Sequence, residues 1–238
     1  MPHHHYSLKD DPSSSHGQIA RIVRQINRGP VLDVGSAQGI FGRLLRDTGL
    51  TIDAVEPNPA WADEARPFYR TVFTGTIETV CSSLPRRHYA TIICGDVLEH
   101  TVDPVLVLRR LREHALPDAT FVISLPNVAH VSVRMMLLFG MFPRMQRGIL
   151  DRTHLHFFTR RTAIQMLHEA GLRVERVLAT PVPLAQLAGD NARRRRILSA
   201  ISSLQRPLVA LLPRMFAFQW IFVAQEQTVA PPSDRPRP

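Results

Sequence analysis

The residues best suited to chemistry in this sequence are glycines and acids placed where an apolar run ends. Residues 31–34 are apolar apart from Asp33, and Gly35 and Gly39 follow before an apolar pattern with helical spacing begins. Glycine lets the backbone turn sharply and come close to a ligand, and the first amides of the next helix face the same corner. A second acid, Glu56, ends the next apolar run. We therefore expect a strand, a tight turn and a helix that hold a nucleotide-like cofactor.

Histidines close to acids form a second group that could move a proton. His100 directly follows Glu99, and an Asp-Arg-Thr-His-Leu-His segment occupies residues 151–156. Histidine suits the work of a general base because its pKa lies near neutrality. His154 is the first candidate for this base, followed by His100 and His130.

Each of these side chains also has a purely structural interpretation. A hydrogen bond from His154 to Asp151 would order the loop, and Glu99 and His100 would order the start of a helix. For His156, packing among the neighbouring aromatic rings is favoured. The sequence leaves these alternatives open for His154 and for the Glu99–His100 pair.

Together, these segments resemble the class I S-adenosylmethionine (SAM) methyltransferases. The glycine spacing does not fit the G-x-G-x-x-G pattern of dinucleotide-binding proteins, whereas residues 31–39 followed by Glu56 are similar to motifs I and II of the methyltransferases. Residues 97–100 and 151–154 are similar to segments of ubiquinone-biosynthesis O-methyltransferases and of bacterial methyltransferases associated with surface polysaccharides. The resemblance implies an α/β fold with a Rossmann-like, seven-stranded, mostly parallel sheet, helices on both faces and an antiparallel seventh strand.

The resemblance also implies S-adenosyl-L-methionine as the cofactor. In this class the glycine turn lies along the methionine part of SAM, and the acid that ends strand two, here Glu56, accepts hydrogen bonds from the ribose hydroxyls. The expected cofactor-binding residues are Asp33, Gly35, Ser36, Ala37, Gly39, Glu56, Pro57, Thr76, Ile77, Cys94, Gly95 and Asp96. Thr76 and Ile77 stand where the adenine is bound. Ala37 replaces a frequent third glycine, so we expect a negative φ at that position.

The acceptor site is expected after strand five and in the loop that precedes Thr159. Its candidate residues are Asn127, Asp151, Arg152 and His156. No metal site is expected, because Cys81 and Cys94 lack the spacing of metal ligands and the histidines at 3–5 resemble a flexible terminal triplet.

Apolar periodicity and capping residues locate the elements of this fold. The strands are expected at 31–34, 50–56, 70–74, 89–95, 119–125, 172–178 and 216–224. Helices are expected at 16–28 after a Ser14 or Ser15 cap, from 59 to about 66, after 104, and after a Thr159 cap. The chain then divides into a flexible N-terminal arm (1–15), a methyltransferase domain (16–224) and a disordered tail (225–238), and the domain contains a lid region (128–158) and an insertion (181–213).

The methionine-rich segment 131–145 is apolar on nearly all sides. Such a helix is either a buried core element or a lid over an apolar ligand. Core packing is the expectation here, and the lid is the alternative.

Charge and composition limit the partners. The 238 residues carry a net charge of +9, but almost all of the positive charge is arginine spread along the chain, and Lys9 is the only lysine. A nucleic-acid footprint would instead be clustered and interleaved with aromatic residues. We expect a small-molecule acceptor, either free or lipid-linked, and no nucleic acid.

The sequence predicts a cytoplasmic protein with reduced cysteines, because no signal peptide and no apolar run of about 18 residues is visible. Arginines 193–196 precede apolar positions up to 212, a pattern that suits peripheral contact with the inner membrane. Cover of the sheet or a homodimer contact by the same segment is slightly favoured over membrane docking.

Three functions remain open at this stage. The first is O-methylation of a saccharide or polyprenyl-linked small molecule in bacterial cell-surface glycan biosynthesis. The second is methylation of a quinone or another small aromatic compound. The third is a catalytically idle, SAM-binding partner of a glycosyltransferase.

Overall fold

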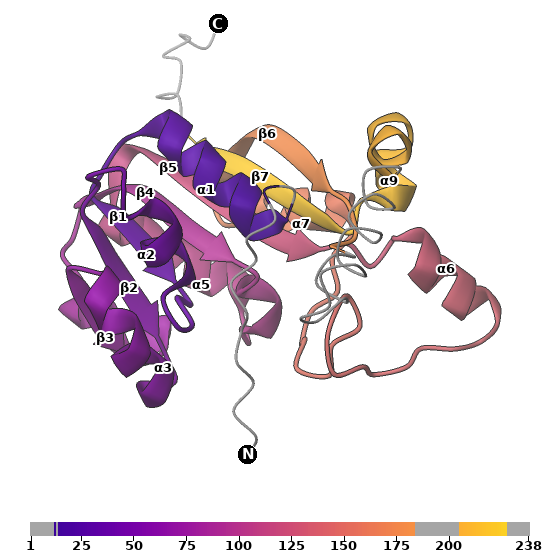
Figure 1. Cartoon of the computed structure of the whole chain (residues 1–238), viewed down its shortest axis with the longest axis horizontal. Coiled ribbons are helices and arrows are strands. Elements are labelled where there is room, and N and C mark those ends of the chain that lie inside the picture. The colour runs from indigo at the N-terminus through magenta and orange to yellow at the C-terminus, as the bar shows by residue number, and fades with distance from the viewer. Residues whose placement is uncertain (1–11, 13, 184–204, 228–238) are drawn as a thin grey trace, which may run out of the picture.

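The structure is a computed structural model that describes residues 12, 14–183 and 205–227, and its strands form one seven-stranded sheet (Figure 1). The strand order is β3-β2-β1-β4-β5-β7-β6. The strands are β1 (Val31–Val34), β2 (Ile52–Glu56), β3 (Thr71–Thr74), β4 (Tyr89–Gly95), β5 (Ala115–Pro126), β6 (Leu172–Thr180) and β7 (Gln219–Glu226). Strands β1 to β5 pair in parallel, and β7 runs antiparallel to both β5 and β6. The expected sheet, with its antiparallel seventh strand, is confirmed.

Helices cover both faces of the sheet. On one face, α1 and α2 pack over the sheet, and on the other α5 and α7 pack together and contribute to the largest apolar core. The helices are α1 (Ser15–Ile26), α2 (Ile40–Leu45), α3 (Pro59–Ala65), α4 (Ile77–Val80), α5 (Pro104–His114), α6 (Val131–Leu138), α7 (Arg160–Glu169) and α9 (Pro213–Phe216). Short 3₁₀ turns η1 (Arg66–Phe68), η2 (Cys81–Ser83) and η3 (Leu98–His100) complete the elements.

Strand β1 shows why the sequence forms a strand buried on both faces. Successive side chains of a strand point to opposite faces, and here Val31 enters the core under α1 while Leu32 and Val34 enter the core under α5. All four residues of β1 are buried. A run that is apolar apart from Asp33 therefore forms a strand that is buried on both faces, as is usual for a central parallel strand.

Capping residues determine where three helices begin. The Ser14 hydroxyl accepts a hydrogen bond from the Gly17 amide at the start of α1, and the Asn58 side chain caps α3. Thr159 caps α7 in a reciprocal arrangement with Thr162. Each cap gives a partner to amides that have none within the helix. The expected caps at Ser14 and Thr159 are confirmed.

Several predicted boundaries are wrong by a few residues. Strand β7 extends to Glu226, so the expected tail cannot begin at 225, and α1 begins at Ser15, inside the expected arm. Phe216 ends α9 instead of starting β7. Residues 205–211 of the expected insertion are helical, whereas the arginines at 193–196 lie outside the described residues.

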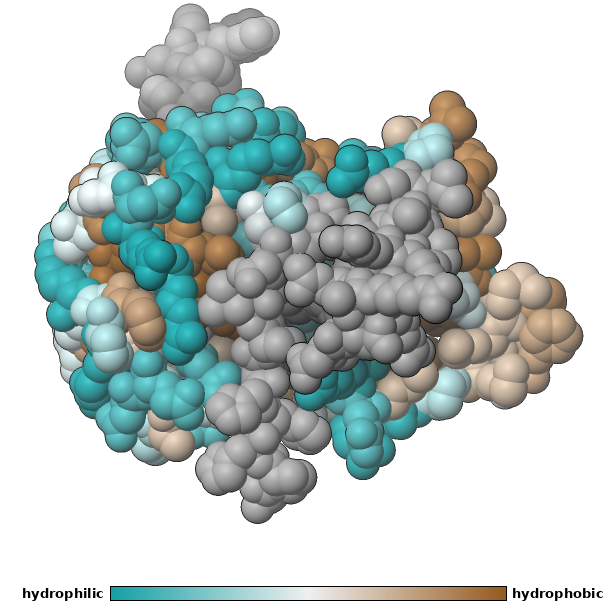
Figure 2. Space-filling view, viewed as in Figure 1, coloured by the Kyte–Doolittle hydropathy of each residue, from teal (hydrophilic) through white to brown (hydrophobic). Residues whose placement is uncertain are grey.

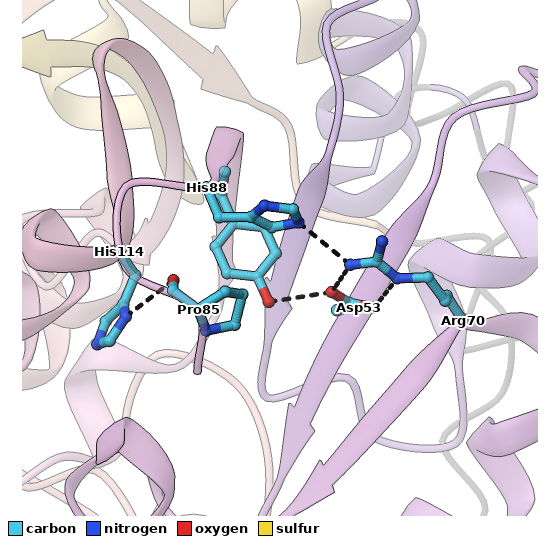
Figure 3. A network of polar contacts seen from close by, with 6 residues as sticks. Asp53, Arg70, Pro85, His88 and His114 are labelled. Carbon is cyan, nitrogen blue, oxygen red and sulfur yellow. Dashed lines mark hydrogen bonds and ion pairs between the residues drawn. The ribbon is translucent and has the colours of Figure 1, made fainter. Parts of the chain in front are cut away.

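A buried ion pair joins β2 to the segment before β3 (Figure 3). The Asp53 carboxylate accepts hydrogen bonds from the Arg70 guanidinium and, at 3.0 Å, from the Tyr89 hydroxyl. The Asp53 side chain is 2% exposed, whereas that of Arg70 is 46% exposed. Arg70 also lies 3.3 Å from His88. These contacts link β2 and β4 to the segment that leads into β3.

We expect Arg70→Met to lower the free energy of unfolding by about 1 to 3 kcal/mol, because it removes charged donors from a buried carboxylate. Urea denaturation measures this change. Arg24→Met is the matched control, since the Arg24–Asp47 pair is exposed on both sides and such pairs contribute about 0 to 1 kcal/mol. Equal losses in the two variants would contradict the assignment.

Candidate active site

The glycine turn after β1 lies against the loop that follows β4. Gly35 has a φ of 73°, and a Cβ on it would lie 2.5 Å from the Val97 side chain. Gly39 has a φ of 87° and precedes α2. Glycine is required at position 35 both for the left-handed backbone and for this close approach. The turn therefore joins the ends of β1 and β4, which are neighbours in the sheet.

Ala37 adopts a φ of 49°, so the expected negative φ at this position is wrong. Its amide donates a 2.7 Å hydrogen bond to Oε2 of Glu56. This bond compensates the steric cost that a side chain pays in the left-handed region. Ala37 therefore adopts the left-handed backbone conformation that usually favours glycine, although it carries a Cβ.

Glu56 links the turns after β1 and β2. Its carboxylate accepts from the Ala37 amide and, through Oε1 at 2.9 Å, from the Asn58 amide. Burial raises the pKa of Glu56, and the two backbone hydrogen bonds oppose that shift. Each carboxylate oxygen can accept more than one hydrogen bond, so both keep capacity for the hydroxyl groups of a ligand.

Two further polar atoms of this corner are buried and fit a polar ligand. Among the described residues, neither Oγ of Ser36 nor Oδ1 of Asp33 has a hydrogen-bond partner. Buried polar groups normally find partners. The glycine turn, the acid at the end of β2 and these two atoms therefore suit a nucleoside cofactor such as SAM.

Asp33 itself is fully buried and connects β1 to α2 through hydrogen bonds. It accepts a 2.5 Å hydrogen bond from the Tyr69 hydroxyl, which in turn accepts one from the Gly42 amide in α2. Burial is the main cause that raises the pKa of Asp33 to about 7, and the negative charge of Glu56 adds to it. Asp33 thus holds α2 in place through Tyr69.

The remaining cofactor candidates follow the ends of β2, β3 and β4. Pro57 is exposed after β2, and exposed Thr76 precedes buried Ile77 at the start of α4. Gly95 ends β4. Because neighbouring parallel strands end at the same edge of a sheet, these positions line one edge with the glycine turn. Cys94 points into the core under α5, and burial raises the pKa of its thiol.

Asp96 belongs to a polar cluster that sequence reasoning did not find. Its Oδ1 accepts hydrogen bonds from the Ser124 hydroxyl in β5 and, at 2.8 Å, from the Gln219 amide in β7. Ser124 and Gln219 are isolated polar residues within apolar strands. That isolation is the signal that could have identified them.

Asn127 and His130 hold the backbone of the chain after β5. The Asn127 amide donates to the Ala217 carbonyl at 2.8 Å, and its oxygen accepts from the Ala129 amide. Nδ1 of His130 accepts from the Ser132 amide and caps α6. Burial lowers the pKa of His130. Both side chains are buried and have these structural partners.

His100 and His154 come together at the end of β4, beside the buried Glu99. Their rings meet edge to face with centroids 4.8 Å apart. The loop is held there by the Glu99 carbonyl, which accepts from the amides of Leu155 and His156 at 2.8 and 3.2 Å. The structure therefore brings together two histidines that lie more than 50 residues apart in the sequence.

The His154 ring is held by a backbone carbonyl. Its Nδ1 lies 3.0 Å from the Ile149 carbonyl, whereas the Asp151 carboxylate accepts from the amide and hydroxyl of Thr153. The side-chain bond between His154 and Asp151, one of the two alternatives that the sequence left open, is therefore not the contact that holds this ring. Burial, and then the proximity of His100, lower the pKa of His154.

His156 and Arg152 flank His154 in the loop but do not belong to the histidine pair. His156 stacks on Phe158 with centroids 5.9 Å apart, and its Nε2 donates to the Val102 carbonyl. Arg152 is exposed, and its carbonyl accepts a hydrogen bond from Arg144.

The methionine-rich segment is mostly exposed, so the expectation of core packing is wrong, although Val133 and Met136 pack in a small apolar cluster with Ile149 and Leu150. Helix α6 projects from the edge of the sheet, and the surface there is coloured as hydrophobic in Figure 2. Within α6 only Val133 is buried. The exposed apolar side chains of this segment, here called the apolar surface, are Met135, Leu137, Leu138, Phe139, Met141, Phe142 and Met145.

Ring contacts connect the apolar surface to the histidine pair. Phe142 meets Phe157 edge to face at 5.4 Å, and Phe157 meets His154 at 6.2 Å. Arg144 lies 5.5 Å from the centre of the Phe157 ring and donates to the His154 carbonyl. The segment 139–145 therefore borders the site.

No helix within 12, 14–183 and 205–227 has the length and apolar character needed to cross a membrane. Leu208, Leu211 and Leu212 are exposed after the undescribed part of the insertion.

Comparison with protein families gives one match over most of the chain. Residues 15–177 match the family described as Methyltransferase domain. The match begins at the first residue of α1 and ends within β6. It therefore includes the glycine turn and the histidine pair.

Among curated proteins, the chain is similar to the ubiquinone biosynthesis O-methyltransferase of Azorhizobium caulinodans. The two are 30% identical over 120 residues, which are 47% of this chain and 46% of that protein. The match thus spans about half the length of this curated relative.

Solved structures share the fold at low sequence identity. A SAM dependent methyltransferase from Archaeoglobus fulgidus aligns with a TM-score of 0.59 at 17% identity, over 90% of this chain and 95% of that one. One from Aquifex aeolicus gives 0.54 at 16%, over 90% and 93%. The 1,6-didemethyltoxoflavin-N1-methyltransferase of Burkholderia thailandensis, with bound 1,6-didemethyltoxoflavin and S-adenosylhomocysteine, gives 0.57 at 16%, over 90% and 79%.

We expect the stability of the protein to fall, relative to that of Asp33→Asn, as the pH rises from 4 to 8. A carboxyl group whose pKa is raised by folding binds more protons in the folded state, so its contribution is present at low pH and is lost as the pH passes about 7. The loss can reach about 4 kcal/mol, at ~1.4 kcal/mol for each pK unit. Urea denaturation of both proteins across this range measures it, and parallel pH curves would contradict it.

Proposed function

The chain belongs to the Methyltransferase domain family, and we propose that it transfers a methyl group from SAM to a hydroxyl oxygen of an acceptor with a large apolar part. The observation that carries this proposal is the position of the histidine pair. Val97, three residues before His100 in the chain, packs against Gly35 of the glycine turn, and Phe157 meets both His154 and Phe142 of the apolar surface.

The corner at the ends of β1 and β2 holds the cofactor. Glu56 is fixed by two backbone amides and accepts hydrogen bonds from the ribose hydroxyls. Ser36 and Asp33 offer buried oxygen atoms to the polar groups beside the turn. When bound, SAM supplies a methyl group whose bonding electrons stay with the sulfur, so the acceptor gains one methyl group and loses one proton.

The histidine pair receives the acceptor hydroxyl. Alignment of the reacting atoms in a site that excludes water supplies much of the rate of a displacement reaction, and a nearby imidazole nitrogen assists loss of the hydroxyl proton. His154 is buried and held by a backbone carbonyl, so its ring has a fixed direction. Asn127 and His130 support the surrounding loop.

The apolar surface binds the apolar part of the acceptor. Several large side chains of 135–145 are exposed on one projecting segment, among them Leu138 at 73% and Phe139 at 69%. An exposed apolar patch of this kind commonly marks a binding site. A saccharide or similar small molecule linked to a polyprenyl chain, as in cell-surface glycan biosynthesis, has both a hydroxyl and a long apolar part.

A prenylated phenol of the quinone type is the second candidate acceptor. It shares the apolar chain, and the curated relative named a ubiquinone biosynthesis O-methyltransferase favours it. The two candidates differ only in the head group that meets the histidine pair.

We expect Glu56→Ala to weaken SAM binding by about 10² to 10⁴-fold, because it removes two charge-assisted hydrogen bonds of ~1.5 to 3 kcal/mol each. Titration calorimetry measures the affinity, and circular dichroism checks the fold. Glu64→Ala, which removes an exposed acid that bonds to Gln38 beside the same turn, should leave the affinity unchanged. An unchanged affinity in Glu56→Ala would refute the cofactor assignment.

The acceptor is tested by mass spectrometry of methyl transfer to polyprenyl-linked saccharides and prenylated phenols, each paired with the same head group lacking the chain. We expect transfer to a chain-bearing acceptor, and a KM raised about tenfold by Leu138→Ser, the equivalent of ~1.4 kcal/mol of lost apolar contact. Leu211→Ser, at an exposed leucine outside the apolar surface, is the matched control.

A role for the apolar surface would be excluded if acceptors without the chain were methylated as efficiently as those with it. It would also be excluded if Leu138→Ser and Leu211→Ser changed the KM by the same factor. SAM binding without transfer to any of these acceptors would favour a SAM-binding partner of another enzyme.

A further inference from the structure

We propose that Glu99, His100 and His154 bind a divalent first-row transition metal ion, and that an open position on this ion takes the acceptor oxygen. The role toward the acceptor rests on the proposed function, whereas metal binding itself does not. In the described part of the chain, each of these three residues offers one potential ligand atom, and the three atoms all lie within 4.8 Å of one another.

The spacing of these atoms is close to that of a metal site. Two ligand atoms that each lie about 2.1 Å from one ion are about 3.0 to 4.2 Å apart, depending on the angle between them. The largest separation here is 4.8 Å. Small rotations of the side chains would therefore bring all three ligand atoms onto one ion.

Backbone carbonyls select the ring nitrogen that binds a metal. Nδ1 of His154 lies 3.0 Å from the Ile149 carbonyl, and Nδ1 of His100 lies 3.3 Å from the Thr153 carbonyl. A carbonyl can only accept, so Nδ1 carries the proton in both rings, and Nε2 of each neutral ring keeps its lone pair. Metal-ligating histidines in proteins are oriented by this same kind of contact at the second nitrogen.

The carboxylate is placed by backbone contacts too. Glu99 is 1% exposed, and its carbonyl accepts from the amides of Leu155 and His156. These two bonds hold η3 against the loop that carries His154. The oxygen ligand and the two nitrogen ligands therefore come from two segments that the backbone fixes to each other.

The donor set indicates the type of ion. Two imidazole nitrogens and one carboxylate favour Mn²⁺, Fe²⁺, Co²⁺ or Zn²⁺ over Mg²⁺ and Ca²⁺, which prefer oxygen ligands throughout. Three protein ligands also leave at least one position for a further ligand, as in catalytic rather than structural sites.

The position of the set gives the ion its role. Val97, which packs against Gly35 of the cofactor turn, lies two residues before Glu99 in the chain. A cation at this place lowers the pKa of a hydroxyl that binds to it and fixes its direction. In this arrangement His100 and His154 hold the ion, the ion takes the place of the ring nitrogen as the group that meets the acceptor oxygen, and the hydroxyl proton passes to water.

The metal-free full-length protein is titrated with Mn²⁺, and the loss of the free-ion signal in electron paramagnetic resonance measures binding. A second titration with Zn²⁺ is measured by calorimetry. All proteins carry serine at positions 3–5 in place of the three N-terminal histidines, which could otherwise bind metal. No SAM and no acceptor is present, so the result does not depend on the proposed function. We expect one ion for each chain.

His100→Ala, Glu99→Gln and His154→Ala should each weaken binding at least tenfold. Because His100 is exposed, its variant should fold even if a buried variant does not. His156→Ala, which removes a neighbouring imidazole outside the set, should bind as the parent does. Absence of a stoichiometric ion, or equal affinity in His100→Ala and His156→Ala, would overturn the metal site.

Methyl transfer separates the two proposals. Loss of transfer on removal of the ion, restored by Mn²⁺ or Zn²⁺, supports the role of the ion toward the acceptor. Full transfer by the metal-free protein would overturn that role and leave the proposed function standing.

Discussion

The arrangement of this site depends on the Glu56 carboxylate and the two backbone amides that it binds. One amide belongs to the turn after β1 and the other to the turn after β2, so a single side chain fixes the distance between the two halves of the cofactor corner. Hydrogen bonds to a charged, buried acceptor are stronger than those between neutral groups. Ala37 keeps its left-handed backbone within this arrangement, so the acid that we propose to bind the ribose also holds the turn in place.

The second half of the site is built by main-chain contacts rather than by side-chain pairing. The Glu99 carbonyl receives two amides from the loop before α7, and the histidine rings are oriented by carbonyls of that loop. The backbone therefore supplies much of the rigidity, and Nε2 of each ring points away from the carbonyl that holds its Nδ1.

The sequence predicted the parts that follow from short-range patterns. Strand β4 was expected with its observed bounds, the caps at Ser14 and Thr159 were correct, and the turn with Gly35 and Gly39 followed from local spacing. The sign of φ at Ala37 was missed because it depends on a carboxylate 19 residues away. Burial of 131–145 was overestimated, since an apolar composition does not say whether another element covers it. The partner of His154 and the link from Asp96 to Gln219 arise only when distant segments meet.

The docking of the 153–156 loop on η3 has a consequence for how such a protein changes over evolutionary time. The cofactor corner lies within residues 31–58, whereas the histidine pair needs a connection across more than 50 residues that is made mainly by backbone atoms. Backbone contacts place few demands on side-chain identity, so most residues of the loop can be exchanged while the loop still docks. Such a chain can diversify toward new acceptors by drift in one loop, without a passage through variants that have lost the cofactor.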